Sequence, residues 1–363
     1  MNFPIDLAHV LERINRIDPI AYCKTRNYVD GDVTYLSPYI SRGLISTKKI
    51  LDAVLAKGYD PNQIERFIQE LAWRDYWQHT WLQKGDAIDS DLIHPQADVK
   101  HAGIPHSIVN ATTGIDAIDA GIQKLYETGY MHNHIRMYVA SLCCNSAKCH
   151  WRQSAQWMYY HLLDGDVASN QLSWQWVCGA NSSKKYVANQ ENINTYTQSN
   201  QKNTFLDVDY ELLHQMDVPN ALIDIEYPLL KTELPTASNI KIDPRKKTAL
   251  YTYYNLDPKW LKEDQLNRIL ILEPSMFEKH PVSNKCIDFA IRIGKENIPK
   301  LQIFVGEFTE LKRHSETTFE FKEHPLNNHF EGNVTTRDFI CKDIDGTFNS
   351  FFSYWKKVKK EVF

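Results

Sequence analysis

Hydrophobic residues recur at helical intervals through the first two hundred residues of the chain. The clearest case lies in residues 63–82, where apolar side chains three and four positions apart share one helix face: Ile64, Phe67, Ile68 and Leu71. Comparable patterns over 116–128, 131–144 and 153–163 predict three more helices, separated by short polar turns. No alternating strand pattern competes with them. This part of the chain is therefore predicted to be all-α.

The pattern changes after about residue 200. Residues 231–245 contain two prolines and several Ser and Thr residues, which is typical of a linker. Beyond it, a helical pattern over 286–293 alternates with short apolar runs, and strands are expected at 249–254, 268–272, 301–305 and 318–321. This alternation favours a small parallel α/β domain. We therefore predict a mainly α protein in three parts: a helical domain over 1–204, a connecting segment over 205–245 and a small α/β domain over 246–363.

Composition limits the class of protein. The chain has 363 residues, 43% of them hydrophobic, so it can bury a large core. It contains no apolar run of about eighteen residues that would span a membrane. Its start lacks the basic and apolar regions of a signal peptide, and its seven cysteines lack disulfide spacing, so a cytoplasmic protein is expected. The net charge of −4 argues against strong indiscriminate binding of nucleic acid but allows a local basic groove.

Aromatic side chains are abundant, and a few of them lie beside charged residues. On the predicted helix over 63–82, four side chains share the face opposite the apolar stripe: Glu70, Trp73, Arg74 and Trp77. A solvated helix rarely carries two indoles beside a carboxylate and a guanidinium. The alternative is that both indoles pack on a neighbouring helix while Glu70 and Arg74 form a surface ion pair.

A second group of polar residues follows on later helices. Asn133, Arg136 and Met137 share one helix face, and the run Asp164-Gly165-Asp166 precedes Asn170. A buried arginine needs a carboxylate partner, since an unpaired buried charge costs several kcal/mol. One alternative is an ordinary core helix with a salt bridge. Metal binding is the other, but His161 is the only further ligand nearby in sequence, so no metal is expected.

Three stretches, residues 129–137, 162–170 and 174–176, resemble the flavin-binding core of the DNA photolyase and cryptochrome family. The resemblance covers about residues 1–200 and implies a helical domain that holds folded-back FAD and moves one electron under blue light. In this family the residue at Arg136 pairs with the one at Asp164 beside the flavin ring. The implied FAD-binding set is Tyr22, Thr34, Leu36, Ser37, Arg74, Arg136, Asp164, Gly165, Asp166 and Asn170.

The same resemblance implies further roles. The residues expected to act on a damaged pyrimidine or on the flavin are Glu70, Trp73, Asn133, Met137 and Asn170, and the expected DNA contacts are Glu70, Trp73, Trp77, Asn133 and His134. Trp174 and Trp151 match the flavin-proximal and middle members of the family's electron relay. The third, exposed tryptophan of that relay has no counterpart in residues 91–116, and Trp157 and Tyr130 are the candidates to replace it.

Several departures from the family affect the DNA site more than the flavin site. The helical block is not preceded by the usual α/β antenna domain, and residues 185–194 replace the usual rim of the cavity. The run Gln171-Leu172-Ser173 stands where many members have Asn-Gly-Gly. His134 stands where a DNA-contacting arginine is common, and Val33 replaces a hydroxyl residue.

The resemblance predicts a blue-light flavoprotein that repairs pyrimidine dimers in DNA, a deoxyribodipyrimidine photo-lyase. The alternatives are a photosensor of cryptochrome type and a flavoprotein with redox activity in the dark. One branch of the family carries an iron–sulfur cluster, but Cys143, Cys144, Cys149 and Cys178 match no ferredoxin spacing, so we interpret them as small buried hydrophobic residues.

The role of the C-terminal domain is left open between two interpretations. Open α/β sheets bind ligands at the carboxyl ends of their strands, so a second chromophore of unknown kind would contact residues 255–257, 273–274 and Gly306. The alternative is a structural domain that covers apolar surface of the helical block. The basic run over 353–360 is either a patch for DNA phosphates or a solvated helix end. The lesion and the oligomeric state are not indicated.

Overall fold

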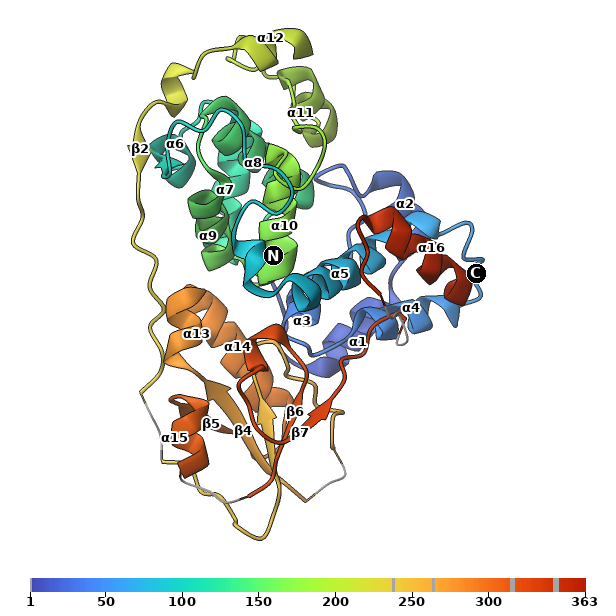
Figure 1. Cartoon of the computed structure of the whole chain (residues 1–363). Coiled ribbons are helices and arrows are strands. Elements are labelled where there is room, and N and C mark those ends of the chain that lie inside the picture. The colour runs from blue at the N-terminus through green and yellow to red at the C-terminus, as the bar shows by residue number, and fades with distance from the viewer. Residues whose placement is uncertain (1, 237–238, 263–264, 314–316, 342–345) are drawn as a thin grey trace. The chain divides into compact units, whose positions relative to one another are not determined.

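A computed structural model of the chain describes residues 2–236, 239–262, 265–313, 317–341 and 346–363 (Figure 1). The chain forms two compact units. The first, here the mixed unit, consists of Met1–Pro19, Thr34–Gln83 and Leu230–Phe363; the second, here the helical unit, consists of Ile20–Val33 and Lys84–Leu229. This grouping by contacts differs from the three parts defined by sequence pattern, which stay a prediction.

The helical unit is built around three helices in its middle. Helix α10 packs against both α8 and α9, and α8 continues into a short π-helix, η2. Helix α7 ends at Gly129, whose φ of +72° and close approach to the Leu163 side chain exclude a larger residue. The elements are α2 (Pro19–Thr25), η1 (Gly85–Asp89), β1 (Ile104–Pro105), α6 (His106–Val109), α7 (Asp116–Thr128), α8 (Asn133–Ser141), η2 (Leu142–Ser146), α9 (Trp151–His161), α10 (Val167–Cys178), α11 (Gln190–Thr197), α12 (Tyr210–Gln215), η3 (Asn220–Leu222) and β2 (Ile225–Glu226).

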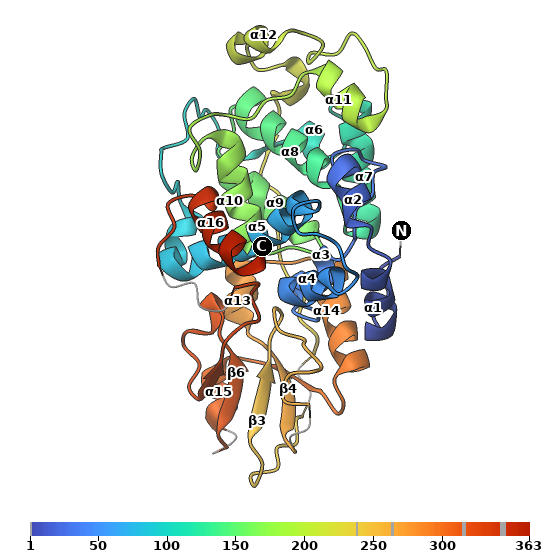
Figure 2. The ribbon, with the colours of Figure 1, turned by 90° about the vertical axis from the view of Figure 1, so that its right-hand side faces the viewer.

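The mixed unit combines the first helices of the chain with a five-stranded parallel sheet. The strand order is β5-β4-β3-β6-β7, so the chain winds outward from β3 in both directions (Figure 2). The elements are α1 (Leu7–Asn15), α3 (Ser37–Ser41), α4 (Thr47–Leu55), α5 (Glu65–Lys84), β3 (Thr248–Tyr251), β4 (Asn267–Leu272), α13 (Pro274–Lys279), α14 (Asn284–Asn297), β5 (Gln302–Val305), α15 (Phe308–Arg313), β6 (Phe319–Lys322), η4 (Pro325–Asn327), β7 (Asn333–Thr335) and α16 (Phe351–Val362).

Helices cover both faces of the sheet. Ile269 and Ile271 of β4 pack with Phe308 and Leu311 of α15 in one buried cluster. Leu270, which points to the opposite face, approaches Gly294 of α14. The four predicted strands are present, and they are parallel as predicted. The fifth strand, β7, is short and largely exposed, so its sequence carries no apolar pattern.

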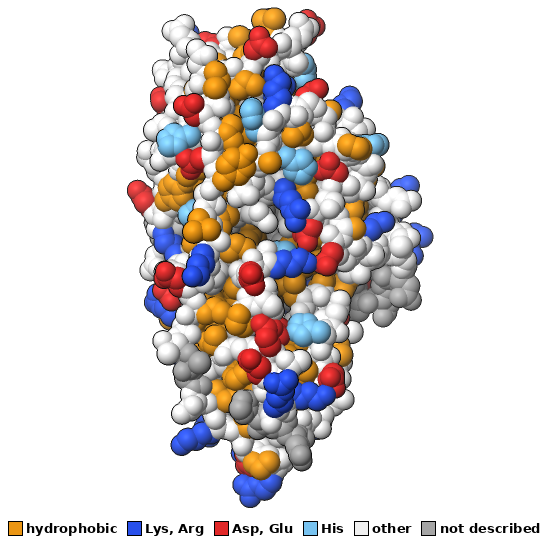
Figure 3. Space-filling view, turned by 60° about the vertical axis from the view of Figure 1, so that its left-hand side comes forward, with side chains coloured by type: hydrophobic (Ala, Val, Ile, Leu, Met, Phe, Trp, Pro, Cys, Tyr) orange, Lys and Arg blue, Asp and Glu red, His pale blue; other side chains and the backbone are white. Residues whose placement is uncertain are grey.

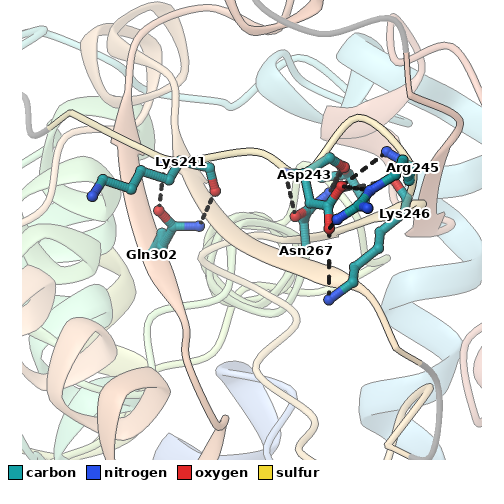
Figure 4. Close-up of polar contacts among 7 residues, drawn as sticks. Lys241, Asp243, Arg245, Lys246, Asn267 and Gln302 are labelled. Carbon is teal, nitrogen blue, oxygen red and sulfur yellow. Dashed lines mark hydrogen bonds and ion pairs between the residues drawn. The ribbon is translucent and has the colours of Figure 1, made fainter.

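The segment before the sheet is bonded to the amino ends of the strands (Figure 4). Gln302 exchanges two hydrogen bonds with the backbone of Lys241, at 2.7 and 2.8 Å. Asn267 does the same with the backbone of Asp243, at 3.0 Å each. The Asp243 carboxylate also pairs with Arg245, which lowers the pKa of this half-buried carboxyl group. Side-chain amides at the starts of β4 and β5 thus bind the backbone of the segment that was predicted to be a linker.

Helix α5 is anchored by a buried carboxylate. Asp75 accepts a hydrogen bond from the Thr47 hydroxyl at 2.7 Å and another from the Ile340 backbone N–H at 2.8 Å. Burial raises the pKa of Asp75 to about 7. One side chain therefore joins α4, α5 and the segment that follows the sheet.

Helix α16 covers the aromatic face of α5. The ring of Phe351 stacks on Trp73, with centroids 3.6 Å apart and planes 8° from parallel. Glu65 accepts a hydrogen bond from the Trp355 indole at 3.3 Å and pairs with Lys359 at 2.9 Å. The basic C-terminal helix is therefore attached to α5 through its apolar face.

Replacing Asp75 by asparagine is expected to change how stability depends on pH. Because the pKa of Asp75 rises from 3.8 to about 7 on folding, the folded protein binds this proton more tightly than the unfolded chain. That contribution to stability is complete below about pH 4 and is lost as the pH rises through about 7. The melting temperature of the wild type minus that of Asp75→Asn should therefore fall between pH 5 and pH 8. Asp52→Asn, at an exposed site on α4, serves as control, and equal slopes for wild type and Asp75→Asn would contradict the assignment.

Removing the Phe351 ring is expected to destabilise the mixed unit. Phe351→Ala should lower the free energy of unfolding by about 3 kcal/mol, as is typical of a buried phenylalanine, because Phe351 is only 3% exposed. The neighbouring Phe352 is 62% exposed, so Phe352→Ala should change stability by no more than about 0.5 kcal/mol. Urea denaturation measures both, and a similar loss in the two variants would show that α16 is not attached through Phe351.

Candidate functional site

A buried ion pair lies between α8 and the turn that precedes α10. The Arg136 guanidinium donates to both carboxylate oxygens of Asp164, at 3.1 and 2.9 Å, and its Nε donates to the Met131 carbonyl at 2.8 Å. The exposed fractions of the two side chains are 22% for Arg136 and 5% for Asp164. Such a pair places two hydrogen-bonding groups in the interior without adding net charge.

The turn after Asp164 is shaped by backbone contacts. Gly165 lies so close to the carbonyls of Tyr159 and Leu162 that a Cβ atom would stand 3.0 Å from each. Asp166 is buried and caps α10 by accepting the Ser169 backbone N–H at 2.8 Å. This helix cap is a role that the sequence analysis did not assign to Asp166, although aspartate is one of the residues preferred at the N-cap of a helix.

Further along α10, the Asn170 amide is fixed by the neighbouring helix. Its Nδ2 donates to the Ala155 carbonyl of α9 at 2.8 Å. The structure therefore brings Arg136, Asp164, Asp166 and Asn170 together around the start of α10. Tyr22, also in the helical unit, lies in α2.

The first turn of α8 carries the other predicted residues of this unit. Asn133 is exposed, and its amide contacts the Met137 sulfur at 3.7 Å. His134 stacks on Tyr196 with ring centroids 4.6 Å apart. Burial and the nearby Arg26 charge lower the pKa of His134 to about 4. His134 is therefore neutral near pH 7 and cannot supply the positive charge of the arginine that is common at this position.

The two predicted relay tryptophans are both buried. Trp151 begins α9 and is fully enclosed, and Trp174 on α10 is 3% exposed. The proposed replacements for the third member, Trp157 and Tyr130, are buried as well. Neither can form an exposed end of a relay. Trp176, two residues after Trp174, is 39% exposed, and the sequence analysis gave it no role.

The remaining predicted residues belong to the mixed unit. Glu70, Trp73, Arg74 and Trp77 lie on α5, where Trp73 contacts both Trp77 and Phe351. Arg74 donates a hydrogen bond to the Ser41 hydroxyl at the end of α3. The predicted loop residues lie just before and within α3, where the Thr34 hydroxyl accepts the backbone N–H of Leu36, and Ser37 is the first helical residue. The predicted set is thus divided between the two units.

The carboxyl edge of the sheet is filled by the chain itself at β3. The Arg42 guanidinium lies 3.6 Å from the centre of the Tyr253 ring, and the Arg42 carbonyl accepts the Leu256 N–H at 2.9 Å. Glu273 accepts the Phe308 N–H and contacts His329, both at 2.9 Å. These contacts are compatible with a structural role for the C-terminal domain. Binding of a second chromophore there stays a prediction.

Within the ranges that the structure describes, no three or more His, Cys, Asp or Glu side chains are arranged to hold a metal ion. In the same residues, no helix combines the length and the apolar character that crossing a membrane requires. Six of the seven cysteines are buried, among them Cys143, Cys144, Cys149 and Cys178, and all seven are free thiols.

Comparison with known proteins assigns one part of the chain to a known kind of domain. The model of the FAD binding domain of DNA photolyase matches residues 67–209, which include α8, the Asp164 turn and α10. The chain carries a photolyase and cryptochrome FAD-binding domain. The match begins within α5 and leaves out the predicted FAD-binding residues Tyr22, Thr34, Leu36 and Ser37.

Relatives within this family are similar over part of their length. The deoxyribodipyrimidine photo-lyase of Streptomyces griseus is 36% identical over 152 residues, which are 41% of this chain and 33% of that protein. A protein of Ostreococcus tauri named cryptochrome DASH, chloroplastic/mitochondrial, is 32% identical over 46% of this chain and 32% of its own. The chain thus spans about a third of the length of these curated relatives. A solved structure, the cryptochrome of Synechocystis sp. PCC6803, is 23% identical with a TM-score of 0.47 and covers 52% of this chain and 42% of that one.

Breaking the ion pair of the photolyase-type domain is expected to destabilise it. Arg136→Gln leaves the Asp164 carboxylate buried without its charged partner, which should cost about 3 kcal/mol of unfolding free energy. Arg152→Gln, at an exposed position of α9, should change it by no more than about 0.5 kcal/mol. Chemical denaturation followed by circular dichroism measures both variants. The double variant Arg136→Gln, Asp164→Asn should recover part of the loss, and a full loss in the double variant would contradict a pairwise origin.

Proposed function

We propose that the photolyase-type domain binds FAD and that the protein uses it for light-driven electron transfer. The observation that carries this proposal is the Arg136–Asp164 ion pair followed directly by the Asp166 cap and Asn170. It lies within the residues that match the family's FAD binding domain. The residues proposed to hold the flavin ring are Arg136, Asp164, Asp166 and Asn170. Tyr22, Thr34, Leu36, Ser37, Arg74 and Gly165 are proposed for FAD on the resemblance alone.

The polar atoms at the start of α10 fit such a ligand. Among the described residues, the Ser169 hydroxyl and the Gln171 amide oxygen are buried without a hydrogen-bond partner. Buried polar atoms are rarely left unsatisfied unless a ligand or water meets them. FAD offers N–H and hydroxyl donors, and the carboxylates of Asp164 and Asp166 are acceptors for such groups.

Bound FAD would supply a chromophore that exchanges one electron after absorbing blue light. The protein itself would exclude water, balance charge and conduct the electron. The Arg136–Asp164 pair keeps the interior near neutrality. Trp174 and Trp151 stand on adjacent buried helices, α10 and α9, which pack on each other. They are proposed as the route by which an electron crosses the helical unit.

The finer proposal is repair of pyrimidine dimers in DNA, the activity named by the photo-lyase relatives. This finer proposal is supported by the presence of the four residues that the resemblance assigns to the lesion pocket: Glu70, Trp73, Asn133 and Met137. Flipping a base out of the duplex costs a few kcal/mol, least for a damaged base, so a lesion is recognised with little sequence readout. On the face drawn in Figure 3, Lys and Arg side chains are interspersed with Asp and Glu, so this face offers no uniformly basic surface for DNA phosphates.

A photosensor of cryptochrome type is the second candidate. It is favoured by the stack of Phe351 on Trp73, because the indole face proposed for a damaged base is already in contact with a ring of the chain itself. The neutral His134 favours it as well, since it removes a positive charge from the DNA site.

Flavin content and light-dependent repair test the two levels of the proposal. The purified protein should be coloured and should release FAD on heat denaturation. After chemical reduction, illumination with blue light should remove dimers from DNA. Glu70→Gln should slow repair at least tenfold with FAD retained, because a positioned proton donor contributes about 10²–10⁴-fold, while Glu191→Gln, exposed on α11, should leave it unchanged.

The outcomes separate the candidates. A colourless protein that takes up no FAD on refolding would overturn the flavin proposal. Retained FAD without loss of dimers would exclude repair and favour the photosensor.

A further inference from the structure

The indole of Trp151 donates its hydrogen bond to a carboxylate. Its Nε1 lies 2.7 Å from Oδ1 of Asp91. The Trp151 ring is completely buried, whereas the Asp91 side chain is 22% exposed. A donor bonded to an ionised acceptor at this distance forms one of the stronger hydrogen bonds in a protein.

The position of this carboxylate is fixed by its surroundings. The other oxygen of Asp91 accepts the Gln96 backbone N–H at 2.8 Å. The Gln96 side chain in turn accepts the Trp151 backbone N–H at 2.9 Å and donates to the Cys149 carbonyl at 2.8 Å. The ring of His150, with its Nε2 3.4 Å from Asp91 Oδ1, faces the same oxygen. The loop over 91–96 is thus bonded to the first turn of α9.

A second tryptophan of the same helix shows that a carboxylate is not needed to satisfy a buried indole. Trp157 is 1% exposed, and its Nε1 donates to the neutral hydroxyl of Tyr126 at 3.1 Å. A buried N–H requires an acceptor but not a charge. The charge beside Trp151 therefore calls for a reason beyond hydrogen-bond satisfaction.

Loss of one electron provides that reason. An oxidised indole carries a positive charge, and its N–H becomes far more acidic than that of the neutral ring. We propose that Asp91 is the proton acceptor of Trp151, so that one electron leaves the ring together with the transfer of its indole proton. The Nε1–H bond breaks, an O–H bond forms on Asp91, and the products are a neutral tryptophan radical and a neutral carboxylic acid. No uncompensated charge is left in the interior.

This inference rests on the proposed function, which supplies the oxidant. The oxidant is a one-electron acceptor that takes the electron through Trp174, and light-excited oxidised flavin is such an acceptor. Its consequence is that the electron hole is held at Trp151. Return of the electron then requires return of the proton, which slows recombination. An exposed third tryptophan in residues 91–116, absent from this sequence, is not needed to separate the charges.

Two measurements on the full-length protein test the proposal. In the dark, the ¹⁵N-labelled indole N–H of Trp151, assigned with Trp151→Phe, should resonate downfield, and Asp91→Asn should move it upfield. Under a laser flash, the wild type should show the absorption of neutral tryptophan radicals. Asp91→Asn should show the protonated cation radical, with recombination faster by about tenfold, the size expected when a hydrogen bond to a charged group is replaced by one to an amide.

Two further variants separate chemistry from structure. Asp91→Glu, which keeps a carboxylate, should restore the neutral radical. Asp98→Asn, at an exposed position of the following loop that pairs with Lys185, should behave as wild type in both measurements. Melting curves check that each variant is folded.

The outcomes distinguish this inference from the proposed function. A wild type that forms no tryptophan radical under light would contradict light-driven electron transfer itself. A wild type that forms radicals whose protonation state and lifetime are the same in Asp91→Asn would overturn the role of Asp91.

Discussion

Satisfaction of the Asp75 carboxylate is the constraint on which the mixed unit depends. A buried acceptor of this kind must keep its donors, since the unpaired group would cost several kcal/mol. Its two donors, on Thr47 and Ile340, come from the beginning and the end of the chain. Helix α5 is consequently held from both sides, and Trp73 is presented in one orientation to Phe351 of α16.

In the helical unit, too, buried carboxylates have hydrogen-bond donors, and one of them is paired with a positive charge. Both buried carboxylates stabilise the fold without a ligand: Asp164 pairs with Arg136, and Asp166 caps α10. Exchange of Asp166 would therefore change the start of α10 itself. Beside this cap, the Ser169 hydroxyl and the Gln171 oxygen are buried without hydrogen-bond partners among the described residues.

The sequence predicted those features that depend on neighbouring residues. Helical periodicity located α5, α7 and α9, and short apolar runs located four strands of the sheet, because both patterns repeat within a few residues. Contacts between distant segments had no such signal. No residue near Trp73 in sequence indicates that Phe351 stacks on it. Asp91 lies sixty residues before Trp151, whose indole N–H donates a hydrogen bond to it. The family resemblance supplied the partner of Arg136, which the general need for charge pairing left open.

The mixed unit is assembled from three separated pieces of chain, with residues 84–229 lying between the second and the third. On the ribosome, α4 and α5 therefore emerge long before Ile340 and Phe351. At the usual rate of synthesis this interval is on the order of tens of seconds. During it the helical unit, nearly continuous in sequence, has time to fold, while the apolar faces of α4 and α5 are exposed to other nascent chains. Aggregation then competes with folding until α16 leaves the exit tunnel of the ribosome.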